Sequence, residues 1–377
     1  MNTLLVTLLA FAVSASAVGA QQRLIVDAQS GPDSDFASVA AALDAANPGD
    51  TIVVRAGMYS EPFLHITEGV AIVGEGTARV ALTGVGSPSA DAMTIEGIPA
   101  DESFSLRGID FAFNGILSPR RIRSLNCAGS VNLQELGGVP DAQGLVGPLV
   151  IEFENCDRAF LQESFVRDGS VRFAGSRGSV VQCVFESGFS TLNSEVLVDR
   201  CTIRPGQPFF LTQPGMTAES STIRLTRSSL FGSSLVSSVP AISTNPGTTI
   251  TLDPTASLNP VGGAAPVEGG GSLINDELTS LNIDAELGLL RLDLQSVVGA
   301  NYATLFSFPA PSTPSPWGEI WVDVAASISI SSGVLTQRTD SCDIVVPANL
   351  TGLQIVLQTV TLTNDIGLSN GCVAVFL

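Results

Sequence analysis

The sequence contains no lysine, a single histidine, and only two tryptophans and two tyrosines in 377 residues. Every basic side chain is therefore an arginine, and chemistry that depends on a lysine base is excluded. The lone histidine, His65, cannot by itself define a Ser-His-Asp triad and gives little support to a zinc site. The scarcity of tryptophan and tyrosine leaves few side chains that could stack on sugar rings.

Charge is also scarce and is unevenly distributed. Charged residues make up 14% of the chain, and 36 acidic residues against 17 arginines give a net charge of −19. Residues 21–103 hold 12 acids and 3 arginines, residues 231–377 hold 12 acids and 2 arginines, and residues 104–230 hold 12 of each. Both ends would repel polyanions, so nucleic acid is not an expected partner, and only the middle offers local positive charge.

The chain begins with a pattern typical of an export signal. An apolar run, Leu4–Val13, is followed by the small residues Ser14–Ala20, and cleavage is expected after Ala17 or, preferably, Ala20. The run is too short to span a bilayer, and no later segment resembles a membrane helix. We therefore expect residues 1–20 to be a signal peptide and the mature protein to be secreted or at the cell surface, not membrane-spanning.

The six cysteines divide into two groups. Cys127, Cys156, Cys183 and Cys201 lie in the middle of the chain without C-x-x-C spacing, and we expect them to be small buried apolar residues. Cys342 and Cys372 lie near the end of an exported chain and are the candidates for a disulfide.

Residues 23–76 carry the strongest local pattern. Short apolar strands flank a segment with helical spacing, which Ser34 or Asp35 is expected to cap and Asn47–Asp50 to end. Asp33 and Asp35 also form a D-x-D pattern, which fits either Ca²⁺ binding or an ordinary helix cap. The expected elements are strands at Leu24–Val26, Thr51–Val54 and Val70–Gly74, and helical positions at Phe36, Val39, Ala40, Leu43 and Ala46.

This opening resembles that of pectin methylesterases and related pectin lyase-like proteins. The shared features are a strand, a helix, the stretch Pro48-Gly49-Asp50-Thr51-Ile52 followed by Gly57, Tyr59 and Glu61, and the strand that ends in Gly74-Glu75-Gly76. The resemblance implies an all-β fold, a right-handed parallel β-helix whose open end is covered by an N-terminal capping helix. It does not imply an activity, because one fold carries many functions.

Repeats in the middle of the chain support the same fold. Ser164-Phe165-Val166, Cys183-Val184-Phe185, Cys201-Thr202-Ile203 and Ser221-Thr222-Ile223 follow one another at intervals of 19, 18 and 20 residues. A recurring strand at a nearly fixed period is typical of a coil in which each strand stacks on the previous one. We expect Ser164, Cys183, Cys201 and Ser221 to stack along one line, with Phe185 inside the coil.

The composition changes toward the end of the chain. The β-helix is expected over residues 21–245, and the Pro- and Gly-rich residues 246–275 are expected to form a linker and a last irregular rung. Residues 276–377 alternate between apolar and polar, which predicts a small antiparallel β-sandwich. The stretch Gly352–Gly371 resembles terminal modules of large secreted bacterial proteins, which implies an accessory or surface role.

Catalytic residues of the resembled family are not found. The motifs that carry the two aspartates and the arginine of pectin methylesterases are not intact, and Asp110, in a partly similar stretch, receives no catalytic role. Strand alternation instead predicts that Glu152, Glu154, Arg172 and Asp199 share one exposed face. Carboxylate pairs serve glycosidases, and an arginine base with Ca²⁺ can serve a polysaccharide lyase, but a stack of surface ion pairs has the same pattern.

The sequence thus favours a carbohydrate-associated, polysaccharide-binding or cell-surface role without intact pectin methylesterase chemistry. Two alternatives stay open. One is a polysaccharide lyase or glycoside hydrolase that acts on an extracellular acidic polysaccharide, and the other is a purely structural or adhesive surface protein. No cofactor is expected apart from Ca²⁺, and the oligomeric state is left open.

Overall fold

The computed structural model describes residues 21–75, 80–82, 91–112, 120–139, 148–205, 213–233, 238–286, 288–309, 311, 313–315, 318–346, 353–363 and 365–375. The expected signal peptide, residues 1–20, lies outside the described residues. In the described part of the chain, one short helix, α1 (Val39–Ala45), accompanies a long series of strands. None of the described helices is long and apolar enough to cross a membrane.

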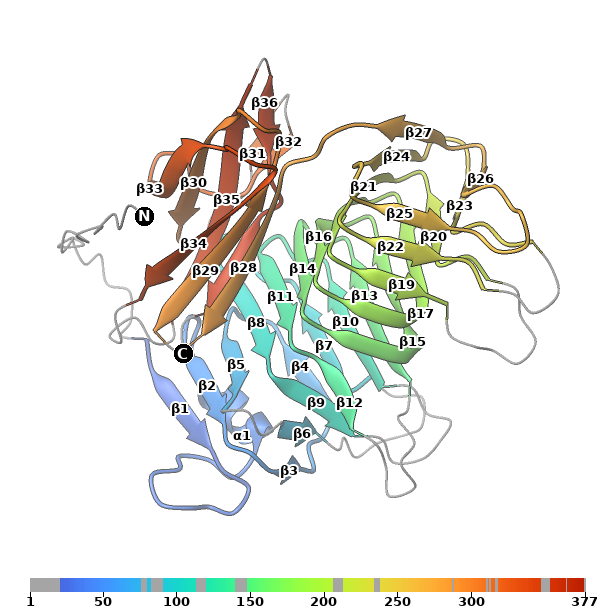
Figure 1. Ribbon diagram of the computed structural model, residues 1–377. Coiled ribbons are helices and arrows are strands. Elements are labelled where there is room, and N and C mark those ends of the chain that lie inside the picture. Colours follow the sequence, from blue (N-terminus) through green and yellow to red (C-terminus); the bar gives the residue numbers. More distant parts are fainter. Residues whose placement is uncertain are drawn as a thin grey trace.

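Eleven parallel strands form the longest continuous ladder, sheet A. From β2 onward, neighbours in this sheet are separated in the chain by strands of other sheets, so the backbone winds as a coil (Figure 1). In chain order the strands are β1 (Arg23–Val26), β2 (Thr51–Val54), β5 (Ala71–Gly74), β8 (Ser103–Arg107), β11 (Ser130–Gln134), β14 (Arg158–Gln162), β16 (Arg177–Val181), β18 (Glu195–Asp199), β21 (Thr222–Thr226), β24 (Thr249–Leu252) and β27 (Ser272–Asn275).

Two further parallel sheets complete the coil. Sheet B has four strands, β3 (Met58–Tyr59), β6 (Val80–Leu82), β9 (Ile109–Ala112) and β12 (Gly137–Val139). Sheet C has twelve, β4 (Leu64–Ile66), β7 (Met93–Glu96), β10 (Arg120–Leu125), β13 (Leu149–Glu154), β15 (Phe165–Ala174), β17 (Val184–Leu192), β19 (Thr202–Arg204), β20 (Met216–Glu219), β22 (Ser229–Phe231), β23 (Ile242–Thr244), β25 (Ser257–Asn259) and β26 (Val267–Gly269). The expected right-handed parallel β-helix is confirmed.

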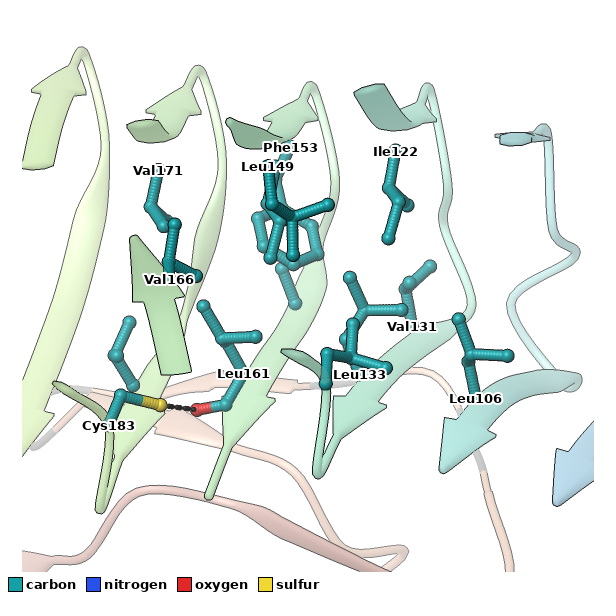
Figure 2. Close-up of a cluster of buried hydrophobic side chains, with 14 of the residues drawn as sticks. Leu106, Ile122, Val131, Leu133, Leu149, Phe153, Leu161, Val166, Val171 and Cys183 are labelled. Carbon is teal, nitrogen blue, oxygen red and sulfur yellow. Dashed lines mark hydrogen bonds between the residues drawn. The ribbon is translucent and has the colours of Figure 1, made fainter. Parts of the chain in front are cut away.

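The interior of the coil is filled by stacked apolar side chains. Alternate residues of each strand point inward, and Figure 2 shows Ile122, Leu133, Leu161 and Val171 converging there from successive strands. Phenylalanines pack from rung to rung: the ring centroids of Phe153 and Phe173 lie 4.7 Å apart, and those of Phe173 and Phe189 lie 6.0 Å apart. Within one rung, the ring centroids of Phe185 and Phe189 lie 5.7 Å apart. This close packing supplies the hydrophobic stabilisation that a chain with few charges needs.

Two columns of left-handed residues mark the corners of the coil. The first corner joins a strand of sheet C to the following strand of sheet A, and the second joins sheet A to sheet B or C. Asparagine and glycine, which tolerate positive φ, dominate the first corner. The first corner comprises Gly97, Asn126, Asn155, Gly175, Asn193, Ser220 and Gly247, and the second comprises Gly108, Glu135, Glu163, Gln182, Arg200 and Arg227.

The expected stack of Ser164, Cys183, Cys201 and Ser221 is only partly correct, because these residues come from two different corners. Ser164, Cys183 and Cys201 do stack, each one residue after a left-handed residue of the second corner. The next residue in that column is Ser228, whose Oγ accepts a hydrogen bond from the Cys201 amide at 3.0 Å. Ser221 instead belongs to the first corner, because its Oγ accepts from the Ser194 amide at 3.2 Å. A small residue follows the left-handed residue at both corners. The tripeptide that begins at Ser221 therefore resembles those that begin at Ser164, Cys183 and Cys201, although it belongs to the other corner.

The N-terminal end of the coil is covered as expected, but the cap residue differs. Ser38, rather than Ser34 or Asp35, is the N-cap of α1, and its Oγ accepts a hydrogen bond from the Ala41 amide at 3.2 Å. The carboxylate of Glu61 accepts two more, from the amides of Val39 at 2.7 Å and Ala40 at 3.1 Å. A buried acid distant in sequence therefore satisfies amides that short-range pattern analysis would assign to a local cap.

Residues 246–275, expected as a linker with an irregular last rung, carry β24 to β27. These strands pair in parallel with β21, β22 and β23 and continue the coil. The Gly269–Gly271 stretch therefore turns between β26 and β27 and does not link two domains. The chain then crosses from β27 to the C-terminal sheets (Figure 1).

The C-terminal region is the expected antiparallel sandwich. One sheet has the order β28-β29-β34, and the other has β33-β30-β35-β36 with β37 also paired to β35. Leu281, Leu292, Ile355 and Leu357 are among the residues that pack between them. The strands are β28 (Ser280–Glu286), β29 (Leu289–Gln295), β30 (Asn301–Ser307), β33 (Ile328–Val334), β34 (Thr339–Val345), β35 (Gln354–Leu362), β36 (Ile366–Leu368) and β37 (Cys372–Val375), with a small hairpin of β31 (Thr313–Ser315) and β32 (Gly318–Ile320).

The structure does not show the expected disulfide between Cys342 and Cys372: both thiols are free, as are those of the other four cysteines. Cys342 lies on β34 opposite Leu292, whereas Cys372 lies on β37 opposite Leu357 in the other sheet. The Cys372 thiol is buried and donates to the Leu281 carbonyl at 3.2 Å. Sequence separation alone could not show that the two strands belong to different sheets.

Candidate functional site

The sandwich covers sheet A and leaves sheet C open. Phe160 and Ser179, on the outer face of sheet A, contact the sandwich: Phe160 packs on Trp321, and the Ser179 hydroxyl donates to the Gly371 carbonyl at 3.4 Å. Sheet C instead bears exposed or half-exposed side chains on its outer face. A ligand that needs a long accessible surface would therefore find it on sheet C.

A single row of outward side chains runs along sheet C, one from each of nine strands that pair in succession from β4 to β26. All except the buried Thr94 are exposed or half-exposed. The members of this outward row are His65, Thr94, Arg123, Glu152, Arg172, Ser190, Thr217, Ser243 and Glu268. Since neighbouring strands lie about 4.8 Å apart, the row offers hydrogen-bonding groups at a regular spacing.

Arginine and carboxylate groups gather around the first half of the outward row. Arg121 lies 3.6 Å from Asp91 and 3.8 Å from Glu152, and Arg123 lies 3.6 Å from Asp91, 3.4 Å from Glu152 and 3.8 Å from Glu154. The Nε atoms of both arginines are buried and donate no hydrogen bond within the described residues, although the two side chains are partly exposed. These long ion pairs hold the side chains on one face.

Arg172 follows Glu152 in the row and is exposed. Within the described part of the chain its guanidinium forms no hydrogen bond or ion pair. A guanidinium carries five N–H donors in a planar fork that matches carboxylates and sugar hydroxyls. Arg172 is therefore the member of the predicted cluster whose donors are open to a ligand.

The start of the row combines a ring with polar groups. The Phe63 ring, 47% exposed, lies nearly parallel to the His65 ring, with 6.3 Å between centroids. His65 Nε2 lies 3.2 Å from Glu96 Oε2. His65, which the sequence connects with neither a catalytic triad nor a zinc site, is exposed and points to the outer face of sheet C.

Asp199 does not belong to the predicted surface cluster. Glu152, Glu154 and Arg172 share the outer face of sheet C, as expected, but Asp199 lies on β18 of sheet A. Its carboxylate is fully buried under the sandwich and bonds the Arg227 guanidinium, which also donates to Ser280 Oγ at 2.9 Å. Burial raises the pKa of Asp199, although Arg227 favours the charged form. Strand alternation predicts which side chains point outward but not which sheet a strand joins, and for this reason the prediction for Asp199 is wrong.

No metal centre is visible in the described residues. No group of three or more His, Cys, Asp or Glu side chains in that part of the chain could hold a metal ion. Asp35 Oδ2 accepts a hydrogen bond from the Ile25 amide at 2.8 Å, while Asp33 is exposed in a left-handed turn. In the structure Asp35 thus accepts a backbone hydrogen bond and Asp33 forms part of a turn. Ca²⁺ binding by this D-x-D pattern stays a prediction from sequence.

A second polar recess lies between the coil and the sandwich and was not foreseen. This crevice of about 420 Å³ is lined by Arg224, Glu277, Thr361, Thr363 and Asp365, among others. Several of its polar groups are already paired: Arg224 with Glu195 at 2.8 Å, and Glu277 with Arg338 at 3.4 Å. The crevice has room for a short ligand but not for a long one.

No family model and no curated protein matches the sequence. Solved structures are similar at low identity. One is pectin methylesterase PemA from Erwinia chrysanthemi, with 10% identity over 68% of this chain and 81% of that chain and a TM-score of 0.25. A second is the pectin methylesterase from Aspergillus niger, with 16% identity over 67% of this chain and 85% of that chain and a TM-score of 0.21. Another is the enzymatically active domain of bacteriophage CBA120 tailspike protein 4, with 12% identity over 86% of this chain and 64% of that chain and a TM-score of 0.22. At these identities and TM-scores the similarities bear on no activity.

Proposed function

We propose that this protein is an exported polysaccharide-binding protein and that the polysaccharide lies along the outward row of sheet C. The observation that carries the proposal is the row itself: a polar side chain from each of nine successive strands, on the face that the sandwich leaves open. A polymer of repeating sugar units can meet such a row with repeated hydrogen bonds, whereas a small ligand would use only a fraction of it.

The charges of the row favour a polymer that carries carboxylates. Arg172 has unused donors, and Arg121 and Arg123 hold their acids only at long range. A carboxylate on the polymer could take a bidentate contact from these guanidinium groups. The five middle members of the row, from Arg123 to Thr217, lie in the part of the chain where arginines balance acids, while the strongly acidic ends would repel the same polymer.

Binding without cleavage fits the cluster better than catalysis. A glycosidase needs one carboxyl group that can donate a proton, and a lyase needs a base near the sugar. Asp91, Glu152 and Glu154 each form ion pairs with Arg121 or Arg123, so none of these three carboxyl groups stands alone on the face. The enzymatic alternative makes a separate prediction, namely shortening of polygalacturonate chains with or without added Ca²⁺, which size-exclusion chromatography would detect.

Calorimetric titration with polygalacturonate and with a neutral β-glucan would test the binding surface. R172A is expected to weaken binding about tenfold, since charge-assisted hydrogen bonds are lost. R291A is the matched control, because Arg291 is an exposed arginine on the sandwich that pairs with Asp343. D365N probes the crevice. Unchanged affinity in R172A together with a loss in D365N would move the site away from sheet C.

Export is the second part of the proposal. It is supported by the apolar run Leu4–Val13 and the small residues that follow it. Mass spectrometry of protein recovered outside the cytoplasm should show a chain that begins at Gln21. An intact Met1 in that material would contradict the proposal.

A further inference from the structure

Four of the six cysteines occupy corner positions of the coil, in two adjacent pairs. Cys127 and Cys156 follow the left-handed residues Asn126 and Asn155 at the first corner, on successive rungs. Cys183 and Cys201 follow Gln182 and Arg200 at the second corner, also on successive rungs. All four side chains are at most 2% exposed, and all four thiols are free in the structure.

The ladder brings the members of each pair face to face. The Asn126 amide donates to Glu154 O and the Asp157 amide to Cys127 O, both at 2.9 Å, so Cys127 and Cys156 are direct neighbours across one ladder step. The Thr202 amide donates to Cys183 O at 2.9 Å and places Cys201 in the same relation to Cys183. One ladder step is about 4.8 Å, inside the Cα–Cα range of about 4.4–6.8 Å seen in disulfides.

The thiols of each pair influence one another. In the first pair the neighbouring Cys156 thiol is the main cause that lowers the pKa of Cys127, and the Cys127 thiol is the main cause that raises the pKa of Cys156. Burial and then the contact with Cys183 raise the pKa of Cys201. Both side chains of a pair point into the coil from the same corner, and Figure 2 shows Cys183 there, with its sulfur directed to the Leu161 carbonyl at 3.5 Å.

Serine at the equivalent positions shows what the corner requires. Ser176 Oγ donates to Ala174 O at 3.0 Å and accepts from the Cys156 amide at 3.0 Å. Ser164 Oγ acts in the same way, with Gln162 O at 2.7 Å and the Leu136 amide at 3.1 Å. Sulfur is a poorer acceptor than oxygen, so cysteine is a weaker choice for this task. Cysteine nevertheless occurs at these corners in two pairs on neighbouring rungs. This arrangement fits a disulfide between rungs better than a hydrogen-bonding role, which serine fills elsewhere.

We propose that Cys127–Cys156 and Cys183–Cys201 form two cross-rung disulfides in the mature protein. The proposal depends on the export proposed above, because disulfides persist in oxidising compartments. The oxidant is a small or protein disulfide, such as oxidised glutathione. For each bond formed, one S–S bond of the oxidant breaks, and two electrons and two protons pass from the cysteine pair to it, giving two thiols. The first bond would hold β10 to β13, the strands that bear Arg123 and Glu152 of the outward row.

Thiol counting would test this directly. The full mature chain is equilibrated with oxidised and reduced glutathione, denatured, alkylated, and mapped without reduction. The expected result is two reactive thiols, Cys342 and Cys372, and two linked peptide pairs as proposed. Six reactive thiols, or any other pairing, would overturn the proposal. Because the oxidation is carried out in vitro, its result depends neither on where the protein resides nor on polysaccharide binding. A negative result would contradict the proposed cysteine pairing alone.

Serine variants give a matched control, since serine occupies the same corners on neighbouring rungs. C127S should release only Cys156, and C183S only Cys201, so each should add one reactive thiol. A phosphine reductant should lower the Tm of the oxidised wild-type chain by several degrees and leave the double variant C127S/C183S unchanged. Equal sensitivity of the two proteins to the reductant would contradict the proposed bonds.

Discussion

Phe160 and Trp321 form the aromatic contact on which the sandwich rests against the coil. Their ring centroids lie 5.1 Å apart with an interplanar angle of 57°. Phe160 points away from the coil interior, since its neighbours Ala159 and Leu161 belong to the interior, yet it is fully buried. Val356 and Val373 complete this small apolar cluster. The outer face of sheet A is therefore an interface between the coil and the sandwich.

Truncation of Trp321 should weaken this interface. W321A is expected to reduce the free energy of unfolding by about 3–5 kcal/mol through lost burial and a cavity. Urea denaturation followed by circular dichroism would measure the change. F308A is the control, because Phe308 is 55% exposed on the same sandwich and its loss should matter by less than about 0.5 kcal/mol. Equal effects of the two substitutions would rule out the proposed importance of the contact.

Truncation of Phe185 inside the coil should strongly reduce the free energy of unfolding. It is fully buried and stacks on Phe189, so F185A should cost about 3–5 kcal/mol by urea denaturation. The adjacent Val184 is 38% exposed on the opposite face of the strand, and V184A should cost far less. A larger effect for V184A would mean that the register of β17 is wrong.

The buried pair Asp199–Arg227 should show strong coupling. R227M leaves the Asp199 carboxylate buried without its partner and should cost about 3–5 kcal/mol. The double variant D199N/R227M should recover a large part of this loss, because no unpaired charge remains. For comparison, R291M breaks the exposed pair with Asp343 and should cost about 0–1 kcal/mol. Additive effects of D199N and R227M would exclude the coupling.

Glu163 should make stability depend on pH. Burial, with Glu135 and Asp284 nearby, raises its pKa, while a hydrogen bond from Gln134 and the charge of Arg107 oppose the shift. The folded state thus binds the proton more tightly than the unfolded chain. The contribution of Glu163 to stability is complete below the ordinary glutamate pKa of about 4.3 and is lost as the pH rises through the raised value.

The variant E163Q isolates this contribution. Its free energy of unfolding, minus that of the wild type, should increase between about pH 4 and pH 7, because the glutamine stays neutral over that range. Urea denaturation of both proteins at several pH values would measure the difference. A difference that stays constant over this range would show that the carboxyl group has the same pKa in both states.

Much of the architecture could be predicted because it is local. The apolar runs Thr51–Val54 and Val70–Gly74, the turn signals between them and the period of about 19 residues demand strands that stack on one another. The candidate site was only partly predictable. Glu152 and Arg172 were correctly placed on one face because they lie on consecutive strands of one sheet, as alternation predicts. Asp199 and Ser221 were misplaced because both corners of the coil use the same small residue after the turn.

The sequence by itself determined that the chain is a coil of short parallel strands with an antiparallel module at its end, since side-chain alternation and turn residues act over a few positions. Only the tertiary structure decided which face is open. The sandwich settles on sheet A through contacts such as Ser105–Gln354, between residues 249 positions apart, and no local pattern records such a distance. That choice buries Asp199 and leaves Arg172 on the free face. The pairing of strands, which is also tertiary, places Cys342 and Cys372 on different sheets of the sandwich and Cys127 beside Cys156 in the coil.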